Sequence, residues 1–391
     1  MTRYLTPTDY GIVATFSVLL AVMTVFVGLS MDGAVEVNFF KLNRDELREY
    51  IGNAFFILLS NFLLALTIVY ILKPYFSFFT KFPEDWILFI VIIALFQSTS
   101  AIVIVLWRVE QKPLPYGLFQ ISRTILKVSL SLSFVVLFVW GWQGRLLGEI
   151  ITSIVFGLLS IFIIIKRKYI NISFNKKYIK DALFFGVPLI PHALGGWILT
   201  GIDRIFINSM VNVAATGLYS VGYQIGAIIG LLAYSFNLAW IPFLYGKLKE
   251  NNYSTKEKIV KFTYLYIGVI IFLALALSFI APYFLKIFVS KDFYFAYKYV
   301  FWIALGHAFQ GMYFMVVNYI FYVKKTYILA WITLFSAGTN IVLNYFFIQA
   351  NGAIGAAQAT TVTFFLQFVM VWILSSKVYK MPWKIWNLDM K

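Results

Sequence analysis

The chain has no cysteine, only two histidines and only 16 acidic residues among its 391. The absence of cysteine excludes disulfides, a thiolate nucleophile and a cysteine-ligated metal site. Charged residues make up 12% of the chain, whereas a soluble domain usually has about 25%. These shortages argue against a soluble protein.

Enzyme signatures are also missing. The sequence has no glycine-rich loop ending in Gly-Lys-Ser/Thr, no His-Glu-x-x-His and no Gly-x-Ser-x-Gly, the motifs typical of ATPases, zinc proteases and serine hydrolases. It also lacks an Asp-x-Asp pair of the kind used by metal-dependent glycosyltransferases. We therefore expect no enzyme, no catalytic residues, no metal and no cofactor.

Long apolar runs are what the sequence does contain, since 61% of its residues are hydrophobic. About 20 consecutive apolar residues cross a bilayer as a helix. Eleven segments meet this criterion: 11–30, 51–72, 86–107, 118–140, 146–165, 182–209, 217–244, 262–280, 300–322, 328–348 and 355–375. The sequence therefore predicts an all-α, polytopic integral membrane protein with eleven spans.

The net charge of +16 comes from lysine and arginine in the segments between the spans. One alternate set of segments carries 22 of these residues, the other set carries 7, and three lie within spans. Cytoplasmic loops are enriched in Lys and Arg. The pattern predicts a cytoplasmic C-terminus and an external N-terminus, and it argues against nucleic acid as a partner.

An external N-terminus without a signal peptide suggests that a first helix is missing. The stretch TPTDYGIVATF before the first span is similar to NVAATGLYSVGY before the seventh, at an offset of 206 residues. Chance similarity is the alternative. We predict a twelve-helix plan in two pseudo-symmetric halves, of which this chain contains eleven helices. Its parts are an N-terminal bundle 1–165 of five helices without the first helix, a basic cytoplasmic linker 166–181, a C-terminal bundle 182–376 of six helices and a cytoplasmic tail 377–391.

Two stretches resemble a known family. RYLTPTDYGIVATF looks like the motif that closes the first loop of polysaccharide, or oligosaccharide, flippases. GVPLIPHALGGWILTGIDRIFI, followed by GLYSVGYQIGAI and FNLAWIPFLYGKL, resembles the start of the C-terminal half of these proteins. Their superfamily, called MOP, also holds multidrug and toxic-compound (MATE) extruders and lipid II flippases.

This resemblance implies two bundles around a central cleft that moves isoprenoid-diphosphate-linked oligosaccharide from the inner to the outer leaflet by alternating access. The implied location is a prokaryotic cytoplasmic membrane, and the implied pathway makes O-antigen, capsule or exopolysaccharide. Membrane lipids, glycosyltransferases and a polymerase are the expected partners, and H⁺ or Na⁺ coupling is an open option. The alternatives are a multidrug extruder of the same superfamily and a membrane polymerase or glycosyltransferase.

The segment 184–210 combines helix breakers with charges. Pro188 and Pro191 remove backbone donors and kink a helix, and interrupted helices often mark the moving parts of transporters. We predict a gate here, and a static kink is the alternative. Arg204 could bind the diphosphate through its planar fork, or it could form an interfacial anchor with Asp203. Asp203 is also a candidate for ion coupling.

Two more charged pairs are spaced four residues apart, which places each pair on one helix face. Arg123 and Lys127 are predicted to receive the diphosphate at the inner mouth, with snorkelling to head groups as the alternative. Asp32 and Glu36 are candidates for carrying a coupling ion, with an interfacial position near Arg44 and Arg48 as the alternative.

Amides within the spans are candidates for binding sugar hydroxyls. Asn340 and Asn344 share a face of the tenth span, and Gln310 lies in the ninth. Side chains of this type more commonly join neighbouring helices. The ladder of Gly222, Gly226 and Gly230 is interpreted as a packing seam because small residues let helices approach closely.

Overall fold

The computed structural model describes residues 1–250, 252–325 and 327–384. All regular structure within these residues is helical. Among the described residues, eleven helical segments are long and apolar enough to cross a membrane, and each overlaps one predicted span. The structure therefore confirms an all-α, multi-pass architecture.

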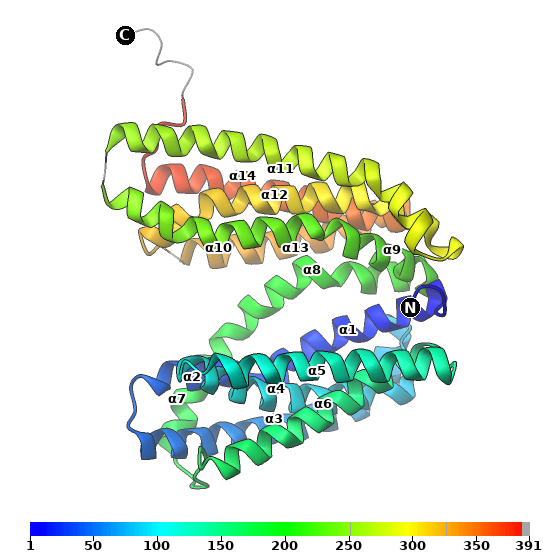
Figure 1. Cartoon of the computed structure of the whole chain (residues 1–391), viewed down its shortest axis with the longest axis vertical. Helices are drawn as coiled ribbons and strands as arrows, with labels where there is room; N and C mark the ends of the chain where they lie inside the picture. Colours follow the sequence, from blue (N-terminus) through cyan, green and yellow to red (C-terminus); the bar gives the residue numbers. More distant parts are fainter. Residues whose placement is uncertain (251, 326, 385–391) are drawn as a thin grey trace. The chain divides into compact units, whose positions relative to one another are not determined.

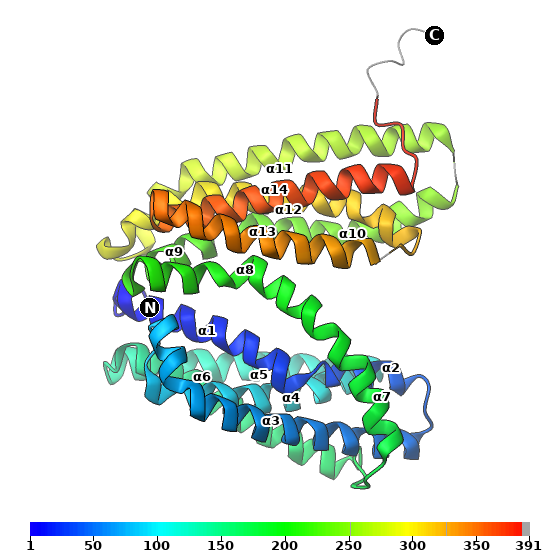
Figure 2. The same cartoon turned by 180° about the vertical axis from the view of Figure 1, so that it is seen from behind.

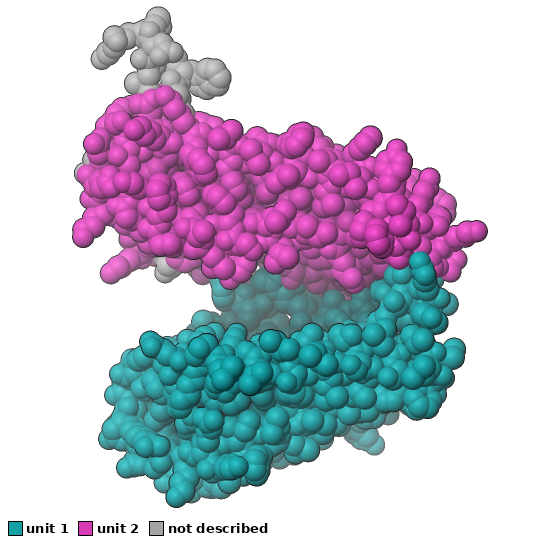
Figure 3. Space-filling view, in the orientation of Figure 1, with its two compact units in different colours: residues 1–197 teal, residues 198–391 magenta. Residues whose placement is uncertain are grey.

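The chain forms two compact units, residues 1–197 and 198–391 (Figure 3). The helices up to the junction are α1 Pro7–Gly28, α2 Met31–Phe39, α3 Arg44–Thr80, η1 Glu84–Trp86, α4 Ile87–Val109, α5 Pro113–Leu132, η2 Ser133–Leu137, α6 Gly141–Lys166, α7 Lys176–Gly186, η3 Val187–Leu189 and α8 Ile190–Met210. In this unit α1, α3, α4, α5 and α6 run alongside one another (Figure 1).

The second unit contains the end of α8 and all later helices. These are α9 Val213–Gly226, α10 Ile228–Lys249, α11 Tyr253–Phe288, η4 Lys291–Ala296, α12 Tyr297–Tyr322, α13 Tyr327–Asn351 and α14 Ala353–Val378. Figure 2 shows α13 beside α14 along most of their length. The predicted tail 377–391 lies partly outside the described residues.

One helix forms the centre of each unit. α4 packs against α1, α2, α3 and α6, whereas α12 packs against α9, α10, α11 and α14. The predicted glycine seam is confirmed, because a Cβ on Gly226 would lie 2.7 Å from Ile303 and one on Gly230 would lie 2.6 Å from His307. Glycine therefore lets α9 and α10 approach α12 closely.

Large apolar side chains remain exposed on the outer helices. Phe78 and Tyr75 on α3 and Phe272 and Phe279 on α11 each have more than 60% of their surface accessible. A soluble protein rarely shows such continuous apolar faces. Lipid is the solvent that suits them.

Helix starts follow from short polar side chains. Thr6 caps α1 and forms a reciprocal capping box with Asp9, and Pro7 occupies the first turn, where its missing donor costs nothing. Asn212 caps α9 by accepting from Ala215 N. Thr6 and Asn212 lie 206 residues apart, so the two stretches that resemble each other in sequence also begin helices at equivalent positions.

The boundary between the units lies later than the predicted linker 166–181. That segment is bound to the first unit: Asn171 N donates to Arg48 O at 3.0 Å and Asn175 N donates to Asn53 Oδ1 at 2.9 Å. Trp197 then donates its indole N–H to Val18 O at 3.0 Å. These bonds keep the chain in the first unit until α8. A hinge role for the linker stays a prediction.

Candidate functional site

A polar cavity of about 360 Å³ lies within the first unit. Five helices line it: α1, α2, α4, α5 and α8. The lining residues are Ala21, Thr24, Val25, Gly28, Ser30, Asp32, Gln97, Ser98, Ala101, Ile104, Arg123 and Ala193. This cavity holds two full charges, three hydroxyl groups and one amide, and membrane-spanning helices form most of its lining. It is therefore a candidate binding site.

A break between α1 and α2 positions the acidic side of this cavity. Leu29 and Ser30 both adopt left-handed backbone conformations, with φ of 44° and 51°. Gly28 lies close to α4, where an added Cβ would be 2.8 Å from Ser98 Oγ. The residues directly after the predicted first span therefore form a separate short helix, α2, which carries Asp32 into the cavity.

Arg123 supplies the positive charge of the cavity from α5. It is half-buried and makes no hydrogen bond or ion pair with a described side chain. Ser98 Oγ, in the same lining, is buried without a hydrogen-bond partner. Arg123 is therefore accessible to a polar ligand, whereas the Ser98 hydroxyl is unpaired but has almost no accessible surface.

Lys127 does not act with Arg123 as a second free cation. Its Nζ lies 3.3 Å from Glu149 Oε2 on α6, and Arg145 lies 4.0 Å from the same oxygen. Gln97 Nε2 donates to Glu149 Oε1 at 3.3 Å, which links this ion pair to the cavity. Arg123 and Lys127 lie one turn apart on α5, as predicted. Their contacts differ, however, so a joint role in binding the diphosphate stays a prediction.

Glu149 and Gln97 were not predicted as site residues. Glu149 is an acidic residue within the predicted span 146–165, and its side chain is only 14% exposed. An acidic residue at membrane depth is costly unless it is paired. The position of Glu149 within a predicted span could therefore have marked it as a site residue. For Gln97 the sequence offered no comparable signal, because a single amide within a span is common.

Asp32 and Glu36 are also separated by their contacts. Asp32 lines the cavity, whereas Glu36 accepts a hydrogen bond from Arg108 at the end of α4. The expected basic neighbours of this pair were Arg44 and Arg48, but Arg48 pairs with Asp45. Of the two acidic residues, only Asp32 therefore lines the cavity.

A second charged cluster is buried in the other unit. Arg204 Nη1 lies 3.0 Å from Asp203 Oδ1, and its guanidinium lies 3.9 Å from the centre of the Tyr223 ring. Asp203 also accepts a hydrogen bond from the hydroxyl of Tyr219, and Arg204 donates to Thr200 O. Asp203 is 1% and Arg204 8% exposed. The cluster is internally satisfied, unlike the interfacial anchor considered from sequence.

The predicted amides all contact other polar side chains, and one of these contacts joins two helices. Asn340 donates to Thr363 Oγ1 of α14 at 3.3 Å, and Asn344 donates to Asn340 Oδ1 at 3.0 Å. Gln310 Oε1 lies 3.0 Å from His307 Nδ1 on the same helix. Only the contact of Asn340 fits the helix-joining role, because the other two lie within one helix. Sugar binding by these residues stays a prediction.

The two prolines interrupt a helix as expected. α7 ends at Gly186, a 3₁₀ turn of Val187–Leu189 contains Pro188, and Pro191 lies in the first turn of α8. The end of α7 lies against the α1–α2 break, since a Cβ on Gly186 would be 2.1 Å from Leu29 O. Two helix breaks therefore meet within the first unit, and gating by them stays a prediction.

The fold and these charged clusters define a polytopic membrane protein with polar groups held at membrane depth. The family model described as polysaccharide biosynthesis protein matches residues 1–246. The chain belongs to this family.

Relatives and solved structures agree with this assignment. An uncharacterized membrane protein of Haemophilus influenzae is 26% identical over 83% of this chain and 79% of its own length. Lsg locus putative protein 1 of the same organism is 22% identical over the same shares.

The lipid II flippase MurJ, in an inward closed conformation, superposes with a TM-score of 0.73 at 18% identity, over 94% of this chain and 81% of its own. A multidrug resistance MATE family transporter of the MOP superfamily, in an inward-facing conformation, superposes with a TM-score of 0.71 at 12% identity, over 96% and 91%. The chain therefore has the fold of this superfamily.

Proposed function

We propose that this protein is a flippase that moves isoprenoid-diphosphate-linked oligosaccharides from the inner to the outer leaflet of a prokaryotic cytoplasmic membrane. The observation that carries this proposal is the combination of a polysaccharide-biosynthesis family match with a chain built almost entirely of membrane-spanning helices. In a pathway that makes polysaccharide, a chain of this kind is suited to the step in which sugars cross the bilayer. The products would be O-antigen, capsule or exopolysaccharide units.

The barrier to this step lies in the polar head group. Each sugar hydroxyl transferred to hydrocarbon without a hydrogen bond costs about 2–7 kcal/mol, and the diphosphate costs more because it is charged. A path lined by polar side chains removes much of this cost. The cavity around Asp32, Ser98 and Arg123 is the described feature of the first unit that supports such a path.

Arg123 is the residue to which we assign the diphosphate, because it lines the cavity and its guanidinium matches phosphate geometry. It forms no hydrogen bond or ion pair with a described side chain, although it lies within the electrostatic field of Glu149. Lys127 would act only after release from Glu149, and Arg204 only after release from Asp203. Asp32 is the proposed site for H⁺ or Na⁺ coupling. The breaks at Gly28–Met31 and at Pro188 would let the helices bend during alternating access.

A multidrug extruder of the same superfamily is the second candidate. Acidic residues at membrane depth favour binding of cationic drugs, and the structure adds Glu149 to Asp32 as such a residue. Expression of the chain in a drug-sensitive strain separates the two functions, because only the extruder raises resistance to cationic dyes.

The proposal is tested by the sidedness of lipid-linked oligosaccharide in cells that lack the gene. Spheroplasts are probed with a lectin after complementation with wild type, Arg123→Gln or Arg44→Gln. Arg44 is an exposed arginine outside the cavity. Arg44→Gln therefore removes the same charge as Arg123→Gln without changing the cavity, and it serves as the control. Loss of charged hydrogen bonds worth about 1.5–3 kcal/mol should lower outer exposure by about 10- to 150-fold for Arg123→Gln, with Arg44→Gln close to wild type.

Two results would contradict this account. Unchanged sidedness in the deletion strain would exclude the flippase role in that cell. Full complementation by Arg123→Gln would leave the flippase role intact but remove Arg123 from diphosphate binding.

A further inference from the structure

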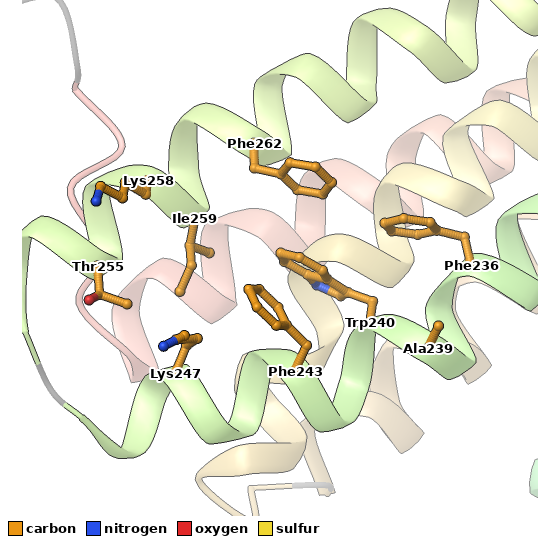
Figure 4. Close-up of a pocket in the computed structure, with 9 residues that line it drawn as sticks. All are labelled: Phe236, Ala239, Trp240, Phe243, Lys247, Thr255, Lys258, Ile259 and Phe262. Carbon is orange, nitrogen blue, oxygen red and sulfur yellow. The ribbon is translucent and has the colours of Figure 1, made fainter.

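A second cavity lies in the unit formed by residues 198–391, between α10 and α11. Its volume is about 580 Å³. Nine residues line it: Phe236, Ala239, Trp240, Phe243, Lys247, Thr255, Lys258, Ile259 and Phe262 (Figure 4). None of these residues belongs to the charged clusters described above.

Aromatic rings line one end of this cavity. The Trp240 ring lies 5.0 Å from that of Phe262 on the facing helix, with an interplanar angle of 19°, and 5.3 Å from that of Phe243. Phe236 extends the stack, 6.0 Å from Trp240. Phe243 is 52% exposed, so the aromatic surface is open rather than sealed. Such a surface suits a flexible hydrocarbon chain.

The other end of the cavity is positively charged. Figure 4 shows Lys247 from α10 and Lys258 from α11 at the end away from Phe236, close to Thr255. Lys247 lies 2.6 Å from Glu250, and Lys258 has no ion-pair partner among the described residues. An ammonium group has three donors, so Lys247 can hold an anionic ligand while it contacts Glu250.

The surrounding segment strengthens this charge. Residues 245–261 contain five lysines and two glutamates, and the charge pattern predicts this segment to be cytoplasmic. Lysines at such a level lie near the phosphates of the inner leaflet, whose anionic lipids attract basic segments. The cavity therefore joins an apolar surface at membrane depth to a cationic pair at head-group level.

We propose that this cavity binds a membrane phospholipid with an anionic head group. The phosphate would lie between Lys247 and Lys258, with Thr255 as a further donor, and one acyl chain would lie along Phe243, Trp240 and Phe262. The cationic end of the cavity matches the anionic head group of a phospholipid, and the aromatic end matches its acyl chain. An apolar protein helix would match the aromatic end only and would leave the two lysines without a partner. The proposal does not depend on the transported substrate.

Fluorescence quenching by brominated lipids tests the proposal on the intact protein, because bromine on an acyl chain quenches nearby tryptophan. Wild type is reconstituted in phosphatidylcholine vesicles that contain a minor fraction of brominated phosphatidylglycerol or, for comparison, brominated phosphatidylcholine. We expect stronger quenching by the brominated anionic lipid. The difference should disappear in Trp240→Phe, which keeps an aromatic ring and removes the one of the eleven tryptophans that lines the cavity.

Two charge-matched double variants locate the head group. Lys247→Gln with Lys258→Gln should abolish at least half of the difference, whereas Lys324→Gln with Lys325→Gln, which removes two lysines outside the cavity, should preserve it. Equal quenching of wild type by the two lipids would overturn the proposal. Equal losses in the two double variants would overturn it as well, because they would indicate general surface attraction. So would a difference that survives Trp240→Phe.

Discussion

At the scale of single residues, the sequence located the charges but not their partners. The three cations predicted to bind substrate, and Asp203 as a candidate for ion coupling, have different environments. Arg123 lies in a polar cavity, Lys127 is paired with Glu149, and Asp203 and Arg204 are paired with each other. Partners that lie 22 residues or more away in sequence, as Glu149 does from Lys127, cannot be assigned from helical spacing. The number of charges was predictable, and their availability to a ligand was not.

The buried pair of Asp203 and Arg204 yields a stability prediction. Asp203→Asn keeps an oxygen acceptor for Tyr219 but leaves the charge of Arg204 uncompensated, and breaking a buried pair on one side costs about 3–5 kcal/mol. The double variant Asp203→Asn with Arg204→Met removes both charges. We expect thermal unfolding in detergent to show a large fall in Tm for the single variant and a much smaller fall for the double variant.

Transport by the double variant adds a second measurement. Retained transport would assign Arg204 to stability alone. A Tm of the double variant as low as that of the single variant would show that uncompensated charge is not what destabilises the protein.

At the scale of elements, hydropathy predicted where helices cross the membrane but not where they begin, end or break. All eleven predicted spans are present, and α11 extends from Tyr253 to Phe288, well beyond the predicted 262–280. Polar residues at helix ends lower the local hydropathy without ending the helix. The break at Leu29 and Ser30 contains no proline, and hydropathy marked it only as the end of the predicted span 11–30. At the second break, Pro188 is itself the signal that the helix is interrupted.

The contact between the two breaks can be tested with glycine variants. An alanine at Gly186 would place Cβ 2.1 Å from Leu29 O, so the backbone must shift. Overpacking of this kind costs about 1–3 kcal/mol. Gly117 in α5 has open space around it, and alanine there should stabilise the helix by up to about 1 kcal/mol.

Thermal unfolding of the purified variants in detergent should therefore show a lower Tm for Gly186→Ala and an unchanged or higher Tm for Gly117→Ala. If both variants unfold at the wild-type temperature, α7 is not held against the α1–α2 break as the structure places it.

At the scale of the whole molecule, composition alone indicated a multi-pass membrane protein, and the sequence motifs indicated its family. The position of the unit boundary was not predictable, because it depends on hydrogen bonds that attach residues 166–197 to helices much earlier in the chain. The equivalent caps at Thr6 and Asn212 agree with two related halves. The direction of insertion inferred from 22 against 7 basic residues stays a prediction.

The central claim is that this chain moves a lipid-linked oligosaccharide across the bilayer. The most direct measurement uses the purified protein in vesicles that contain the glycolipid extracted from the deletion strain. A membrane-impermeant glycosidase is added outside. In protein-free vesicles it should cleave only the outer half of the glycolipid. With wild-type protein, cleavage should approach completion, and with Arg123→Gln it should be at least about tenfold slower. Cleavage that stops at the outer half with wild-type protein would contradict the account.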